Sequence, residues 1–110
     1  MNIENNLKIS LLLEIYGKLL TQKQCEILDE FYNDNISISE IAINHNSSRQ
    51  AVNDLIKRSV NVLNDYEQKL GLLQKFNSIK EKVSIAITSL DNGIDKQSLI
   101  KTFNEILEDV

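Results

Sequence analysis

Apolar residues recur every three or four positions along most of the chain, which predicts a protein built from amphipathic helices. The first predicted helix covers residues 5–20, where further apolar positions widen the main stripe. The stripe consists of Leu7, Leu11, Leu12, Ile15 and Leu19, and the additional positions are Ile9, Leu13, Tyr16 and Leu20. A helix with so broad an apolar surface is expected to be buried on more than one side.

Three short motifs predict where the following helices begin. In a capping box, a Ser or Thr hydroxyl accepts from a backbone N–H three residues on, and the Glu or Gln there reaches back. This spacing occurs at Thr21–Gln24, Ser37–Glu40 and Ser47–Gln50. We expect the second helix to end at residues 33–35, because Asn and Asp side chains compete for backbone hydrogen bonds. The third is expected to stop near residues 45–46.

From Ser47 the helical pattern continues to Gly71 without a strong helix breaker. Its inward positions are separated by alternating steps of four and three residues, which is a heptad pattern. These seam positions are Val52, Ile56, Ser59, Leu63, Tyr66, Leu70 and Leu73. Such a seam either packs on the chain's own helices or forms a dimer interface. We favour a homodimer, because so small a chain has little else to cover helices that are apolar on two sides.

After Leu73 the apolar pattern shifts its phase, which predicts a bend or a helix boundary within residues 71–75. Asp91, Asn92 and Gly93 form a turn, and a final helix is expected from about Lys96 to Glu108. The predicted fold class is all-α, with a helix-turn-helix domain that continues into a long helix and C-terminal helices. We expect a domain over residues 1–70 and a helical extension over 71–110 that packs on it or on a dimer partner.

Residues 37–58 have the pattern of a helix-turn-helix motif. Ala42 is small where two helices would cross closely, and Asn46 lies at the turn, where a left-handed conformation is needed. Val52 and Leu55 are spaced to pack back on the first helix of the motif. The second helix would then present its N-terminal residues to a major groove. The predicted nucleic-acid-binding residues are Ser48, Arg49, Gln50, Asn53, Lys57 and Arg58.

These side chains suit the two kinds of contact that DNA offers. Arg49 could bind guanine in a bidentate manner, and Gln50 or Asn53 could pair with adenine. Ser48, Lys57 and Arg58 would bind phosphates, although Arg49 and Gln50 could equally serve only as surface residues.

Charge limits how large a nucleic-acid surface can be. The net charge of the chain is -4, and residues 21–58 hold four basic and six acidic side chains, a net charge of -2. Few phosphates could be neutralised, so we expect modest affinity that falls with salt.

Other chemistry finds little support in the sequence. A single cysteine, Cys25, and a single histidine, His45, exclude an internal disulfide and a His/Cys zinc site. There is no phosphate-binding loop and no nucleophile motif, so we expect no enzyme activity, no cofactor and no metal. His45 is expected at a helix terminus, where it interacts with the helix dipole. The lone cysteine and the absence of a long apolar run predict a cytoplasmic protein without membrane insertion.

Residues 19–76, and above all SRQAV at 48–52 and YEQKLGLL at 66–73, resemble the YlxM family of small bacterial proteins, also called UPF0122. The helix-turn-helix is also similar to the promoter-reading C-terminal domain of sigma factors. The resemblance implies an all-α, DNA-binding regulatory protein of the signal recognition particle pathway. Its candidate partners are DNA and the GTPase or RNA of that particle. Asn46 replaces the usual glycine of the turn. The alternative is a protein–protein adaptor that uses the helix-turn-helix as a scaffold without nucleic-acid contact.

Overall fold

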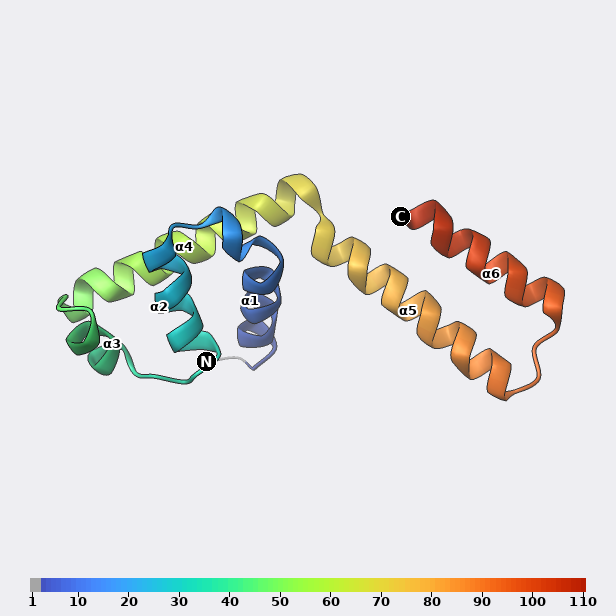
Figure 1. Cartoon of the computed structure of the whole chain (residues 1–110), viewed down its shortest axis with the longest axis horizontal. Coiled ribbons are helices and arrows are strands. Elements are labelled where there is room, and N and C mark those ends of the chain that lie inside the picture. The colour runs from blue at the N-terminus through green and yellow to red at the C-terminus, as the bar shows by residue number, and fades with distance from the viewer. Residues whose placement is uncertain (1–2) are drawn as a thin grey trace. The chain divides into compact units, whose positions relative to one another are not determined.

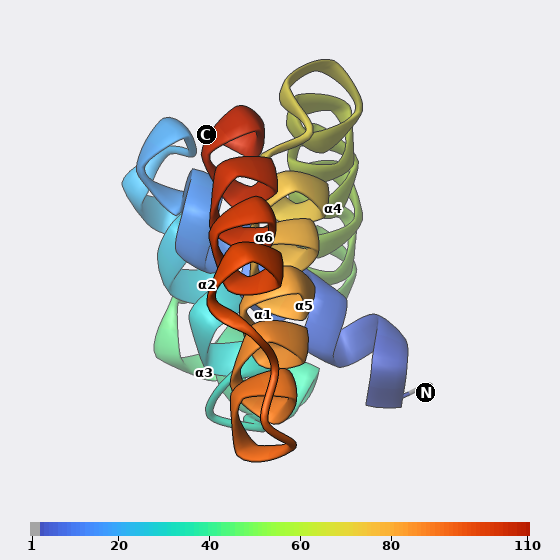
Figure 2. The ribbon, with the colours of Figure 1, turned by 90° about the vertical axis from the view of Figure 1, so that its right-hand side faces the viewer.

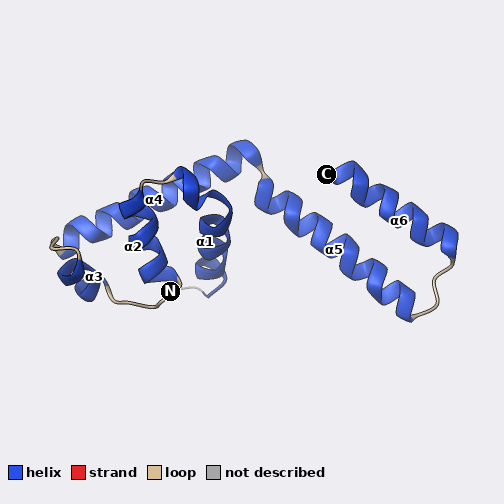
Figure 3. Cartoon of the chain, in the orientation of Figure 1, coloured by secondary structure: helices blue, strands red, loops and turns tan. Residues whose placement is uncertain are grey.

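The computed structural model of the chain describes residues 3–110. Within this range the regular elements are six α-helices and one 3-10 turn (Figure 3). The predicted all-α fold class is therefore confirmed. The chain divides into two compact units, one ending at Gly71 and one spanning Leu72–Val110, and each is described by itself. No helix within residues 3–110 is long and apolar enough to cross a membrane.

The first unit is organised around its longest helix. Its elements are α1 (Ile3–Tyr16), the 3-10 turn η1 (Gly17–Leu19), α2 (Gln22–Tyr32), α3 (Ile38–Asn44) and α4 (Arg49–Leu70). The helices α1, α2 and α3 all contact α4 and lie along one side of it (Figure 1). Among the residues of this unit whose burial is described, 4–71, the buried apolar side chains are Ile9, Leu12, Leu13, Tyr16, Ile27, Leu28, Ile41, Ala42, Val52, Ile56 and Leu63.

The first half of the heptad seam lies in this core. Val52, Ile56 and Leu63 are buried, and Ser59 is buried with its hydroxyl donating to the Leu55 carbonyl oxygen at 2.7 Å. Further along the seam, Tyr66 is half-buried and Leu70 is 55% exposed. The seam residues up to Leu63 are therefore buried between α4 and the other helices of their own chain.

The predicted first helix was wrong in its end, and only part of its predicted apolar surface is buried. The α-helix ends at Tyr16, because Gly17 weakens the helix and the chain tightens into η1 before the extended Leu20. The buried face carries Ile9, Leu12, Leu13 and Tyr16, whereas Leu7 and Leu19 are exposed. Two overlapping stripes have helical spacing in this segment, and spacing alone does not choose between them.

Tyr16 links the end of α1 to the C-terminal half of α4. Its hydroxyl donates to Glu67 Oε1 at 2.7 Å, and its ring stacks on Tyr66 with 5.9 Å between ring centroids. A buried tyrosine needs a partner for its hydroxyl, and Glu67 supplies it. The hydrogen bond to Glu67 therefore satisfies the Tyr16 hydroxyl, while the ring of Tyr16 makes an apolar contact.

The second unit is a helical hairpin of α5 (Leu72–Asp91) and α6 (Lys96–Asp109), which run antiparallel (Figure 2). The predicted boundary before it is confirmed, because α4 ends at Leu70 and Gly71 adopts a left-handed φ of 63°. The predicted turn and final helix are also confirmed to within a residue. Asp95 caps α6 by accepting from the backbone N–H of Ser98 at 2.7 Å.

Polar contacts at Asp109 fix which sides of α5 and α6 face each other. Lys82 Nζ donates to Asp109 Oδ2 at 2.5 Å, and Ser78 Oγ donates to the same oxygen at 3.3 Å. The hydrogen bond from the Lys82 ammonium holds the pKa of Asp109 below its usual value. The sequence spacing around Lys80, Glu81 and Lys82 gives no sign of this contact. Lys82 reaches a carboxylate 27 residues away, a separation that no local pattern relates.

Candidate nucleic-acid interface

The turn between α3 and α4 is fixed by backbone hydrogen bonds. The Ser47 N–H donates to the Ala42 carbonyl oxygen at 2.9 Å, and the Asn46 N–H donates to that of Ile43 at 3.2 Å. These two bonds form a Schellman motif, whose penultimate residue adopts the left-handed conformation. Asn46 fills that position with a φ of 51°. The predicted left-handed residue at Asn46 is therefore confirmed.

Substitution of Asn46 should change stability according to backbone conformation alone. Asn46→Gly is expected to leave the free energy of unfolding within about 0.5 kcal/mol, because glycine adopts a positive φ without strain. Asn46→Val is expected to cost roughly 1–2 kcal/mol, because its Cβ opposes the left-handed conformation. Asn44→Val, at an exposed helical position nearby, is the control, since Asn and Val have similar helix propensities. Equal costs for the two valine variants in urea unfolding would contradict the assignment.

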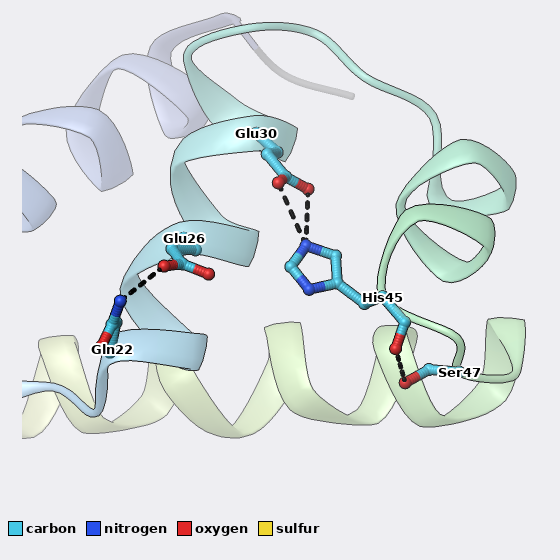
Figure 4. A network of polar contacts seen from close by, with 5 residues as sticks. All are labelled: Gln22, Glu26, Glu30, His45 and Ser47. Carbon is cyan, nitrogen blue, oxygen red and sulfur yellow. Dashed lines mark hydrogen bonds and ion pairs between the residues drawn. The ribbon is translucent and has the colours of Figure 1, made fainter.

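A histidine–glutamate pair joins α2 to the end of α3 beside this turn. His45 Nε2 lies 3.0 and 3.1 Å from the two carboxylate oxygens of Glu30 (Figure 4). The two side chains are only 17% and 25% exposed. His45 is the C-cap of α3, so its expected place at a helix end is confirmed. The contact with Glu30 was not predicted, because no local spacing relates residues that lie 15 positions apart.

The start of α4 differs from the prediction by one residue. Ser48, not Ser47, is the N-cap, and its Oγ accepts from the Ala51 N–H at 3.0 Å. Ser47 Oγ donates instead to the His45 carbonyl oxygen at 3.4 Å, as Figure 4 shows. The Ser47–Gln50 capping box was therefore wrong. The Schellman turn already uses the Ser47 backbone, which moves the cap one residue later and places Gln50 in the first helical turn, exposed.

The predicted nucleic-acid-binding residues fall on one end of α4. Gln50 and Lys57 are exposed on the helix face opposite the buried Val52 and Ile56, and Arg58 is exposed beside them. Arg49 is exposed in the first turn, and Asn53 is half-buried at the flank. We call this group, with the N-cap Ser48, the α4 surface.

Asp54 lies at the centre of the α4 surface, at an exposed position for which no nucleic-acid contact was predicted. It is exposed between Gln50 and Lys57, and a hollow lined by Ala51, Asp54, Lys57 and Arg58 opens there. The Arg58 Nε donates to the Asp54 carbonyl oxygen at 3.4 Å, so this guanidinium folds back along the helix. Helical spacing from Gln50 and Lys57 was the signal that places Asp54 on the same face.

The local charge of the α4 surface is positive, although the whole chain has a net charge of -4. Arg49, Lys57 and Arg58 outnumber the single acid, Asp54. The first turn of any α-helix adds backbone N–H groups without intrahelical partners and the positive end of the helix dipole. An anionic ligand would therefore meet attraction here and repulsion over much of the rest of the chain.

Nearly the whole chain matches one protein family. Residues 3–108 match the family described as "UPF0122: Putative helix-turn-helix protein, YlxM / p13 like". A UPF0122 protein of Clostridium kluyveri is 43% identical over 90 residues, which cover 82% of this chain and 81% of that protein. A UPF0122 protein of Fusobacterium nucleatum is 40% identical over 107 residues, which cover 97% of this chain and all of that protein.

A third relative, the UPF0122 protein of Clostridium acetobutylicum, is 36% identical over 111 residues and is matched over 96% of its length. These matches extend over the helix-turn-helix and over the C-terminal hairpin. The resemblance carried by SRQAV and YEQKLGLL thus holds for nearly the whole sequence. The chain belongs to the UPF0122 family of YlxM/p13-like proteins.

Proposed function

We propose that this protein is a non-enzymatic, cytoplasmic regulator that binds duplex DNA through the α4 surface. The observation that carries the proposal is the exposure of Arg49, Gln50 and Lys57 at the N-terminal end of α4, directly after the turn that Asn46 closes. Helix-turn-helix proteins read the major groove with the N-terminal residues of their second helix. The family description as a helix-turn-helix protein supports the same function.

The contacts divide into those that position the helix and those that read bases. Lys57 and Arg58 are assigned to phosphates, together with the Ser48 hydroxyl, whose hydrogen is not used by the N-cap bond. Arg49 is assigned to guanine, and Gln50 or Asn53 to adenine. Asp54 can accept from the amino group of cytosine but repels phosphate. The α4 surface therefore suits base contact at its centre and phosphate contact at its edges.

The salt dependence of binding tests this proposal directly. With Lys57 and Arg58 on phosphates, log K for random duplex DNA should fall against log salt with a slope of roughly -2 per copy of the chain, measured by fluorescence anisotropy. A much steeper slope would require basic residues outside the α4 surface. Undetectable binding at low salt would contradict DNA binding and would favour the adaptor, which uses the helix-turn-helix only as a scaffold.

A place in the signal recognition particle pathway is the finer part of the proposal. It is supported by the resemblance to the YlxM family, and an acidic chain with a net charge of -4 suits a basic protein partner. Retention of the purified chain by the particle's GTPase, and titration with the particle's RNA beside the random duplex, test it. Binding to neither would remove this part of the proposal and leave DNA binding to be judged by itself.

A further inference from the structure

The α5–α6 hairpin exposes many large apolar side chains. Phe76, Val83, Ile85, Ile87, Leu90, Ile100, Phe103, Leu107 and Val110 are all exposed in this unit. Only Leu73 and Ala86 are buried apolar residues there. Two packed helices cannot enclose a core, and a soluble protein rarely leaves a large apolar patch open to water.

Most of these residues lie on one side of the hairpin. Lys82 and Ser78 on α5, and Asp109 on α6, mark the sides on which the two helices face each other. On each helix an apolar stripe lies about 100° around the helix axis from these contact residues. The rotation has the same sense on both helices when each is viewed from its own N-terminus. Because the helices are antiparallel, the two stripes lie on the same side. We call this side the hairpin face, and it consists of Phe76, Val83, Ile87 and Leu90 on α5 with Ile100, Phe103 and Leu107 on α6.

We propose that the hairpin face is covered by the hairpin face of a second copy of this chain, so that two hairpins form an antiparallel four-helix bundle. In this arrangement α5 packs on α5 of the partner and α6 on α6, about a two-fold axis that crosses the helices. Closed two-fold dimers are the commonest protein assemblies. The proposal concerns the hairpin alone and holds whether or not α4 binds DNA.

The exposed area is of the size that a stable dimer needs. The seven side chains of the hairpin face are between 39% and 68% exposed. At about 150–200 Å² for a large apolar side chain, this amounts to roughly 600 Å² per copy before the polar rim is counted. Stable interfaces bury about 800 Å² per partner. The apolar area of this face together with a polar rim therefore matches the area that each partner of a stable dimer usually buries.

Charges beside the hairpin face also favour a second copy. Lys80 and Asp91 lie on the outer edge of α5, on the same side of the helix because eleven residues make almost three full turns. The midpoint between them falls at Ile85 and Ala86, two to three residues beyond Val83 at the middle of the α5 stripe. A two-fold axis there brings Lys80 of each copy opposite Asp91 of the other, twice. The edge of α5 is thus complementary to itself in the antiparallel orientation.

The first unit offers no comparable surface along the heptad seam. Val52, Ile56 and Leu63 are already buried by helices of their own chain. A second copy could reach them only if that core opened. The hairpin face, in contrast, is accessible without any rearrangement within its own unit.

The hairpin contains a matched pair of residues for the test. Ile87 is 57% exposed on the hairpin face, and Ile85 is 56% exposed on the opposite side of α5. The full chain and both aspartate variants are compared by sedimentation velocity over a range of protein concentrations. We expect a mass of two chains for the wild type and for Ile85→Asp, and at least about 100-fold weaker association for Ile87→Asp. A monomeric wild type, or equal loss in both variants, would overturn the proposal and point to another occupant of the face.

A charge exchange tests the antiparallel orientation without changing the apolar face. Lys80→Asp should weaken the dimer, because it places two carboxylates opposite each other. Adding Asp91→Lys to the same chain should restore association, since the pair is then reversed. Circular dichroism of each variant checks that helix content is kept. No recovery in the double variant would contradict the pairing of Lys80 with Asp91.

Discussion

A Leu63→Ala variant is expected to destabilise the first unit by about 3 kcal/mol. Leu63 lies in the middle of α4 and is completely buried, and α4 contacts α1, α2 and α3. Removal of a buried leucine side chain costs its transfer free energy and leaves a cavity, which together amount to about 2–5 kcal/mol. Tyrosine fluorescence during urea unfolding reports this unit by itself, because Tyr16, Tyr32 and Tyr66 all belong to it.

Ser59→Ala is the control for this prediction, on the same buried side of α4. The Ser59 hydroxyl donates only to the carbonyl oxygen of Leu55 in its own helix, so its loss should change stability by less than about 1 kcal/mol. If both variants were equally mild, Leu63 would not be a core residue. Because Leu63 is buried, its replacement disturbs folding together with any function. Variants on the α4 surface are therefore needed to test the adaptor alternative.

The double variant Arg49→Ala/Lys57→Ala is expected to weaken duplex DNA binding by about 100-fold at low salt. The two substitutions remove a base contact, which contributes roughly 1–3 kcal/mol, and a phosphate contact, whose loss weakens binding to every sequence and lowers the salt slope by about one. Both side chains are exposed, so the melting temperature should hardly change. Fluorescence anisotropy with a labelled duplex gives the affinities, and a thermal melt checks the fold.

Two further substitutions on α4 sharpen this prediction. Lys69→Ala removes an exposed lysine from the opposite end of the same helix and should leave the affinity unchanged. Asp54→Asn removes a negative charge at the centre of the α4 surface and should strengthen binding to random duplex DNA. Equal losses from Lys69→Ala and from the double variant would show that binding depends on total charge and not on the α4 surface.

Structural features that depend on one short segment of the chain were predicted well from the sequence. The Thr21 capping box is complete, with Thr21 Oγ1 accepting from the Gln24 N–H and Gln24 Oε1 accepting from the Thr21 N–H. The left-handed residues Asn46 and Gly71 lie where turn chemistry places them. Each of these features depends on the conformational preference of one residue and its near neighbours.

Features that depend on distant parts of the chain were not predictable in the same way. The buried face of α1 is chosen by the helices packed on it, which select Ile9 over Leu7 although both stripes have helical spacing. The contacts of His45 with Glu30 and of Lys82 with Asp109 join residues on different helices. The cap of α4 moved from Ser47 to Ser48 because the preceding turn, not the capping pattern, sets where the helix starts.

A map of backbone amide shifts on DNA binding tests the proposed role of α4 most directly. The full chain, labelled with ¹⁵N, is titrated with a short random duplex at low salt and followed by heteronuclear NMR. We predict that the largest shifts fall on residues 46–58 and that the amides of α5 and α6 hardly move. Shifts confined to the hairpin, or spread evenly over the chain, would contradict DNA binding through the α4 surface.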